Sequence, residues 1–107
     1  MPSILNSLKL ISDPTRLRLL ILLESEELSV AEMQSILGMG QSRISTQLSQ
    51  LKKESPVSDR RVGKNNLYSS SAPASLIQVA HQAAEEISEI STDRAALRLT
   101  LSKRKDR

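Results

Sequence analysis

The 107-residue sequence contains no cysteine, tryptophan or phenylalanine, and Tyr68 is its single aromatic residue. Without cysteine the chain forms no disulfide and offers no thiolate to a metal. Its core must therefore be aliphatic. No apolar run approaches the roughly 20 residues that span a bilayer, and the N-terminal sequence lacks the basic start and long apolar run of a signal peptide. We expect a small soluble domain in a bacterial cytoplasm, with no membrane partner.

The positive charge is concentrated in two segments, although the net charge is only +3. Residues 41–64 contain six basic and two acidic side chains, and residues 94–107 contain six basic and one. The segments 1–40 and 65–93 are net acidic. Two basic segments in an otherwise acidic chain indicate a polyanionic partner.

The first third of the chain predicts two helices. Residues 3–12 have apolar side chains at helical spacing, which is typical of a short amphipathic helix. Asp13 is a good N-cap, and Pro14 suits a first helical position because its missing N–H costs nothing there. Residues 17–23 are apolar on nearly every side, so this second helix should be the most buried.

A helix-turn-helix is predicted over residues 29–53. Ser29 and Glu32 have the spacing of a capping box, and Gly38 supplies the positive φ that ends a helix. Only Met39 and Gly40 separate this helix from the next helical pattern. Two helices joined by so short a glycine-containing turn are typical of the helix-turn-helix.

The second helix of this pair has an uncharged, hydrogen-bonding face. At about 100° per residue, Ile44, Leu48 and Leu51 form the buried stripe. The opposite side carries small polar and basic residues: Ser42, Arg43, Ser45, Thr46, Ser49, Gln50 and Lys53. Such side chains match the donors and acceptors of major-groove base edges, and the first turn normally enters the groove. A serine-rich face that is merely solvated is the alternative.

A β-hairpin is predicted immediately afterwards, because strand-forming residues flank the turn "GKNN" at 63–66. Arg60, Arg61 and Lys64 are expected at or near its tip, within reach of a phosphate backbone. A solvated basic turn is the alternative. A hairpin that directly follows a helix-turn-helix makes a winged helix, so we expect a mainly α fold with one small hairpin.

A third long helix is predicted from about residue 71 to residue 91. Its apolar seam consists of Leu76, Ala80, Ala83, Ile87 and Ile90. Small residues in a seam permit close helix approach, which favours a dimer contact over intrachain packing. Residues 92–107 are predicted to form a short basic helix, restarting at Ser91 or Thr92, that packs loosely at the dimer.

The segments "LISDPTRLRLLILL", "ELSVAEMQSILGMGQSRISTQLSQLKK" and "DRRVGKNNLYS" resemble the ArsR/SmtB family of winged-helix repressors over roughly residues 5–70. The resemblance implies a homodimer formed by the first and last helices, two recognition helices on an inverted repeat in duplex DNA, and repression relieved by an effector. The base-reading residues would be Gln41, Ser42, Arg43, Ser45 and Thr46. Lys53, Arg60, Arg61 and Lys64 would contact phosphates. The dimer residues would be Leu5, Leu8, Leu76, Ala80, Ala83, Ile87 and Ile90.

The sequence departs from this family at several positions. Ser55-Pro56 replaces the usual Gly-Leu step, which predicts an altered end of the recognition helix and a re-aimed wing. Gly40 replaces a common N-cap serine. Metal-sensing relatives have cysteines where this chain has Ser29 and Ala31. With His81 as its only histidine, the chain has too few nitrogen and sulfur donors to hold zinc well.

These observations predict a DNA-binding repressor with no metal, no cofactor and no catalytic centre, released by a small-molecule effector. Residues 1–91 would form the DNA-binding and dimerisation domain, and residues 92–107 a basic helical tail or a linker to a further domain. Two alternatives remain. One is the regulatory module of a larger methyltransferase polypeptide; the other is a winged helix used only for protein–protein contacts.

Overall fold

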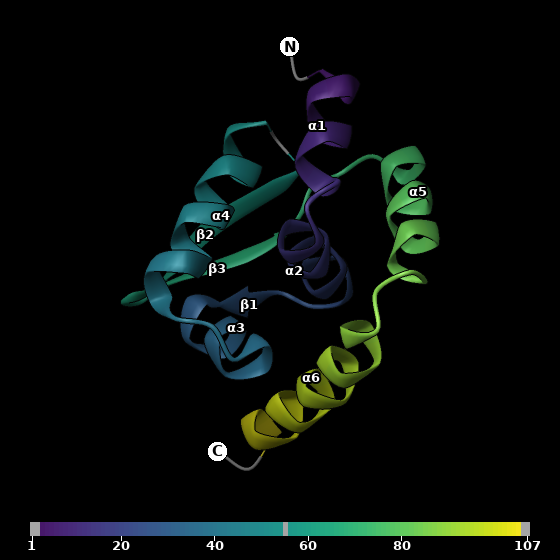
Figure 1. Cartoon of the computed structure of the whole chain (residues 1–107). Helices are drawn as coiled ribbons and strands as arrows, with labels where there is room; N and C mark the ends of the chain where they lie inside the picture. The colour runs from purple at the N-terminus through teal and green to yellow at the C-terminus, as the bar shows by residue number, and fades with distance from the viewer. Residues whose placement is uncertain (1–2, 55, 106–107) are drawn as a thin grey trace.

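Six helices and a three-stranded antiparallel sheet make up residues 3–54 and 56–105, the part of the chain that the computed structural model describes (Figure 1). None of these helices is both long and apolar enough to cross a membrane. In chain order the elements are α1 (Ile4–Ile11), α2 (Pro14–Ser25), β1 (Leu28–Ser29), α3 (Val30–Leu37), α4 (Gln41–Lys53), β2 (Val57–Val62), β3 (Asn65–Ser70), α5 (Ala74–Ala84) and α6 (Glu89–Lys105).

Helix α2 lies at the centre of the molecule, where it packs against α1, α4, α5, α6 and β3 (Figure 1). The predicted start is confirmed, because the Asp13 carboxylate accepts a hydrogen bond from the Arg16 backbone N–H at 3.1 Å and Pro14 is the first helical residue. Leu19 and Leu20 are completely buried. An aliphatic helix at the centre supplies the core that the missing aromatic residues would otherwise provide.

The predicted capping box and helix end of α3 are also confirmed. Ser29 Oγ accepts from the Glu32 N–H, and the Glu32 carboxylate accepts from the Ser29 N–H at 3.0 Å. Gly38 ends the helix at φ 67°, in the left-handed region that favours glycine. Helix α4 begins three residues later and packs against α3, which completes the predicted helix-turn-helix.

The sheet has the strand order β1-β3-β2, with the β2–β3 hairpin extending from the body of the molecule (Figure 1). The hairpin turn is shorter than the sequence predicts: Gly63, at φ 62°, and Lys64 form it, and Asn65 and Asn66 already pair in β3. Strand β1 was not predicted. It pairs Leu28 with Tyr68 and so joins the wing to the start of α3.

The prediction of one long helix over residues 71–91 is wrong. Helix α5 ends at Ala84, the chain turns through residues 85–88, and α6 leaves in a new direction (Figure 1). Consequently the five residues of the predicted seam do not share a helix face. Ile87 lies in the turn, and Ile90 belongs to α6.

Helix α6 packs on α2 and α3 of its own chain, where a loose extension was expected. Asp93, 2% exposed, receives two hydrogen bonds from the Arg18 guanidinium, at 2.8 and 2.9 Å. Leu97 is buried beside them in the core. These contacts hold α6 in its turned direction. The helix begins at Glu89 and runs unbroken past residue 92.

Candidate nucleic-acid interface

The polar face predicted on α4 is exposed. Ile44, Leu48 and Leu51 turn into the core at 0–1% exposure. The opposite side presents Gln41, Ser42, Arg43 and Thr46 to solvent, with Ser45 half-buried at its edge. The first turn begins at Gly40, which makes no side-chain capping bond, as its replacement of serine predicts. A first turn rich in exposed hydrogen-bonding groups is therefore accessible to a partner.

One flank of α4 is held by the beginning of α2. Arg16 donates through Nη1 to the side-chain oxygens of Gln47 and Gln50, at 3.0 and 2.9 Å. Arg43 donates to the Thr15 hydroxyl at 3.2 Å. These hydrogen bonds join segments that are about 30 residues apart in sequence.

The other flank of α4 is held by the wing. Lys52 Nζ lies 2.8 Å from Asp59 Oδ1, and this hydrogen bond raises the pKa of the Lys52 ammonium above its usual value. Both partners are partly exposed, so the pair sets geometry more than stability. Lys52 is consequently engaged within the chain, whereas Lys53, the next residue, is exposed.

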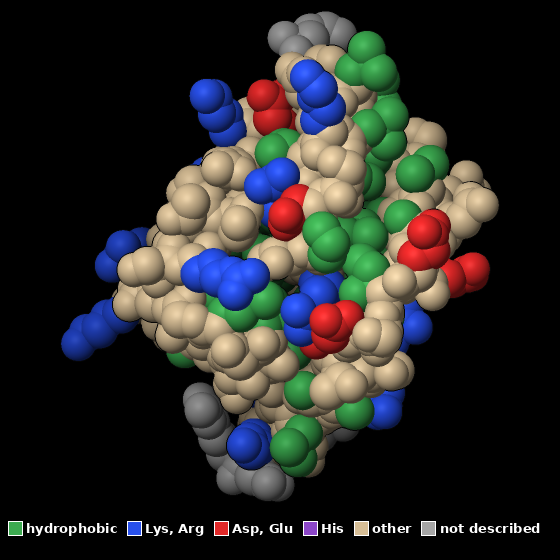
Figure 2. Space-filling model, viewed as in Figure 1, with side chains coloured by type: hydrophobic (Ala, Val, Ile, Leu, Met, Phe, Trp, Pro, Cys, Tyr) green, Lys and Arg blue, Asp and Glu red, His purple; other side chains and the backbone are tan. Residues whose placement is uncertain are grey.

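The tip of the hairpin carries two accessible cations. Arg61 and Lys64 are exposed, and Arg61 Nε donates to the Gly63 carbonyl at 3.2 Å. Basic side chains project at the left edge of Figure 2, where Figure 1 shows the hairpin tip. Because successive residues of a strand point to opposite faces, Arg60 cannot accompany Arg61 on the same face of the wing.

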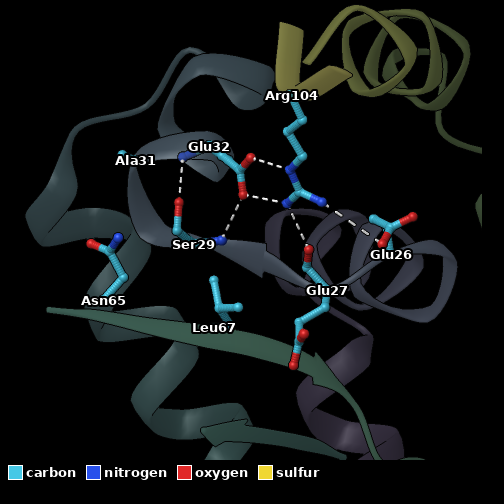
Figure 3. A pocket seen from close by; sticks show the side chains of 8 residues that line it. All are labelled: Glu26, Glu27, Ser29, Ala31, Glu32, Asn65, Leu67 and Arg104. Carbon is cyan, nitrogen blue, oxygen red and sulfur yellow. Dashed lines mark hydrogen bonds and ion pairs between the residues drawn. The ribbon is translucent and has the colours of Figure 1, made fainter. Parts of the chain in front are cut away.

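A pocket of about 530 Å³ lies between β3, the beginning of α3 and the end of α6 (Figure 3). The Glu32 carboxylate accepts hydrogen bonds from both the Arg104 guanidinium and the Ser29 N–H, and these bonds lower the pKa of Glu32. The lining residues are Glu26, Glu27, Ser29, Ala31, Glu32, Asn65, Leu67 and Arg104.

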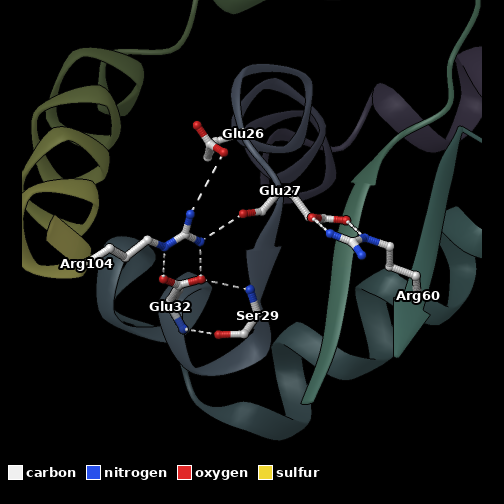
Figure 4. A network of polar contacts seen from close by, with 6 residues as sticks. All are labelled: Glu26, Glu27, Ser29, Glu32, Arg60 and Arg104. Atoms are coloured by element: carbon white, nitrogen blue, oxygen red, sulfur yellow. Dashed lines mark hydrogen bonds and ion pairs between the residues drawn. The ribbon is translucent and has the colours of Figure 1, made fainter. Parts of the chain in front are cut away.

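Arg60 lies within β2, opposite Leu67, and not at the hairpin tip. Its guanidinium donates twice to the Glu27 carboxylate, at 2.7 Å each, and lowers the pKa of Glu27 (Figure 4). The Glu27 backbone carbonyl in turn accepts from Arg104 at 2.9 Å. This network connects α6 to the wing and occupies the side chain that we predicted to contact phosphate.

The positions related to metal sites do not bring together a set of metal ligands. Ser29 and Ala31 border the pocket of Figure 3, but Ser29 Oγ is already the helix cap. His81 lies on α5 with its Nε2 3.3 Å from the Glu24 carboxylate. Within residues 3–54 and 56–105 no three His, Cys, Asp or Glu side chains are grouped to hold a metal.

The predicted dimer residues divide into two groups. Leu76, Ala80 and Ile90 are buried in the chain's own core, and Leu8, Ala83 and Ile87 pack partly against it, which is the intrachain alternative. Leu5 is 70% exposed on α1. Ile4 and Val79 on α1 and α5, which were not predicted, are also about half exposed. Figure 2 shows hydrophobic side chains in a band along α1, toward α5.

A helix-turn-helix followed by a hairpin, with the second helix exposed, defines a winged helix-turn-helix protein. The family model described as "Bacterial regulatory protein, arsR family" matches residues 13–55. A protein named "Transcriptional repressor SmtB homolog" from Synechocystis is 39% identical over 59 residues, which are 55% of this chain and 45% of that relative. The chain thus spans less than half the length of this curated relative.

Two solved structures extend the similarity over most of the chain. Rv0081 of Mycobacterium tuberculosis is 34% identical, with 83% of this chain and 89% of that one covered and a TM-score of 0.65. The homodimeric winged helix-turn-helix DNA-binding domain of Mb0332 from Mycobacterium bovis is 27% identical, with coverages of 80% and 82% and a TM-score of 0.68. The chain belongs to the ArsR family of bacterial transcriptional regulators.

Proposed function

We propose that this protein is a transcriptional repressor that binds an inverted repeat in duplex DNA as a homodimer. The observation that carries the proposal is the exposed face in the first turns of α4, which consists of amide and hydroxyl side chains with one arginine. A helix fits the major groove, where amide, hydroxyl and guanidinium groups pair with base edges. The base-reading residues are Gln41, Ser42, Arg43, Ser45 and Thr46, and Thr15 must release Arg43 for this.

Phosphate contacts are assigned to Lys53 on α4 and to Arg61 and Lys64 on the wing. All three are exposed and form no ion pair with a carboxylate of the described residues. Arg60 joins them only if it exchanges Glu27 for a phosphate. The tip residues therefore supply the wing's main electrostatic attraction to DNA.

The homodimer is assigned to the apolar face of α1 and α5. Ile4, Leu5 and Val79 are exposed there, and α1 and α5 are in contact. The relative from Mycobacterium bovis is described as homodimeric, and the one from Synechocystis as a repressor. We assign release from DNA to a small molecule and not to a metal, because the chain has no cysteine and one histidine.

Salt-dependent binding tests this proposal. A preferred duplex is selected from a random library, and fluorescence anisotropy measures affinity for it and for a scrambled duplex across salt concentrations. Lys64→Ala should weaken both and reduce the salt slope by about 0.9 for each lost phosphate contact, of which a homodimer loses two. Ser42→Ala should cost about 1–3 kcal/mol on the selected duplex alone.

Lys103→Ala, an exposed change on α6, serves as the control for lost charge. It should leave both affinities and the salt slope unchanged, because Lys103 is not among the residues assigned to phosphate. If the wild-type protein shows no salt-dependent affinity for either duplex, DNA binding is wrong and the protein–protein alternative gains support.

A further inference from the structure

One arginine joins three elements behind the DNA-facing surface. Arg16, half-buried at the beginning of α2, donates through Nε to the Leu10 carbonyl of α1 at 2.7 Å. Through Nη1 it donates to the side chains of Gln47 and Gln50 on α4. A single planar guanidinium therefore connects α1, α2 and the middle of α4.

The position of these two glutamines around α4 determines which motion of the helix their bonds to Arg16 oppose. At about 100° per residue, Gln50 lies about 80° and Gln47 about 140° around the helix from Ser42. Hydrogen bonds at these angles resist rotation of α4 about its own axis. The Lys52–Asp59 pair resists the same rotation from the other side. The rotation of α4 about its own axis, its roll, decides which side chains face the major groove of bound DNA.

We propose that Arg16 is a positioning residue for base recognition: it fixes the roll of α4 relative to α1 and α2 without itself touching DNA. This inference rests on the proposed function. The bond from Arg16 to the Leu10 carbonyl also ties α4, the recognition helix, to α1, which is assigned to the dimer. Arg16 therefore sets the orientation of each recognition helix within the dimer. A lysine cannot replace it, because one ammonium lacks the fork that reaches a carbonyl and two amides together.

The test is Arg16→Lys, which keeps the charge and removes the fork. Affinity is measured by anisotropy for the selected and scrambled duplexes described above. Arg16→Lys should lose roughly five- to tenfold on the selected duplex, as expected for one misplaced base contact, with no change on the scrambled duplex or in the salt slope. The pair Gln47→Met with Gln50→Met should produce the same loss. Adding Arg16→Lys to that pair should cost nothing more, because the three residues act as one unit.

Two controls separate positioning from general effects. Arg98→Lys makes the same chemical change at an exposed site on α6, and Leu97→Val lowers stability through a core residue remote from α4. Neither should change the ratio of the two affinities. The inference is overturned if Leu97→Val reproduces the lost preference, if Arg16→Lys leaves the preference intact, or if it weakens both duplexes equally. Failure of the wild-type protein to bind any duplex overturns the proposed function and this inference together, whereas the other results overturn only the role of Arg16.

Discussion

Replacing Asp93 by alanine should destabilise the protein far more than its position near the C-terminal end suggests. The Asp93 side chain is 3% exposed and its partner Arg18 14% exposed. Two hydrogen bonds join them, and they raise the pKa of the Arg18 guanidinium, which stays charged. Removing one partner of a buried pair costs about 3–5 kcal/mol. Because Arg18 retains some contact with water, we expect about 2–4 kcal/mol for Asp93→Ala.

Urea unfolding followed by circular dichroism measures this loss at pH 7. In thermal unfolding the melting temperature should fall by about 8–32 °C, since each of the 2–4 kcal/mol shifts it by about 4–8 °C in a domain of this size. Arg94→Ala, an exposed change on the same helix, is the matched control and should cost less than about 0.5 kcal/mol. Replacing both partners, by Arg18→Met with Asp93→Leu, should recover most of the stability because no unpaired charge remains.

A loss below about 0.5 kcal/mol for Asp93→Ala would refute this reasoning. It would mean that water or another group solvates Arg18 as well as Asp93 does. In that case α6 would be the loosely attached extension that the sequence suggested.

Three further predictions concern the capping box, the turn and metals. Glu32→Gln keeps a side chain that can complete the capping box but removes the charge that pairs with Arg104, so it should cost about 0.2–1 kcal/mol at neutral pH. The hydrogen bond from Arg104 lowers the pKa of Glu32 from its usual value of 4.5. The stability advantage of the wild type over Glu32→Gln should therefore be complete above pH 4.5 and disappear as the pH falls through the lowered pKa. Urea unfolding of both proteins from pH 7 to pH 3 measures this advantage. Gly38→Ala should cost about 1–2 kcal/mol from backbone strain alone, because no atom lies within 4 Å of an added Cβ. Gly40→Ser should instead stabilise the protein by a few tenths of a kcal/mol, because serine can cap α4. Equal effects of the two substitutions in thermal unfolding would contradict this reasoning. Zinc should change affinity for the selected duplex by less than about twofold, whereas a tenfold loss at micromolar zinc would show metal regulation.

Elements that are signalled by adjacent residues were predicted well. Two helix starts are marked by hydrogen bonds that span three positions. The Asp13 side chain accepts from the Arg16 N–H, and the Ser29 side chain accepts from the Glu32 N–H. Gly38 marks a helix end through its own φ. These signals act within one turn, so the sequence alone contains them. Strand β1 was missed because it has only two residues, and their partners in β3 are far along the chain: Tyr68 is 40 positions from Leu28, and Leu67 is 38 positions from Ser29.

The break between α5 and α6 had no such local signal. Residues 85–88 contain neither glycine nor proline, so propensity and periodicity allow a continuous helix there. What stabilises the turn is remote: Arg18 pairs with Asp93 across 75 positions, and Leu97 reaches the core. Tertiary contacts overrode local preference, and three residues of the predicted seam, Leu76, Ala80 and Ile90, are buried in the chain's own core.

The polar residues of α4 show why a site is harder to predict than a fold. Gln41, Gln47 and Gln50 have the same side chain, yet Gln41 is exposed at the first turn and the other two bind Arg16. Lys52 and Lys53 are adjacent and of the same residue type, but only Lys52 pairs with Asp59. Composition could not separate these residues. Their angle around the helix does, because the flanks of α4 face α2 and the wing, and the strip between those flanks is the face that we propose for DNA. The proposed recognition face is therefore compatible with a firmly held helix, since Gln47, Gln50 and Lys52 hold α4 from beside that face, and Arg43, bonded to Thr15, is the residue assigned to both roles.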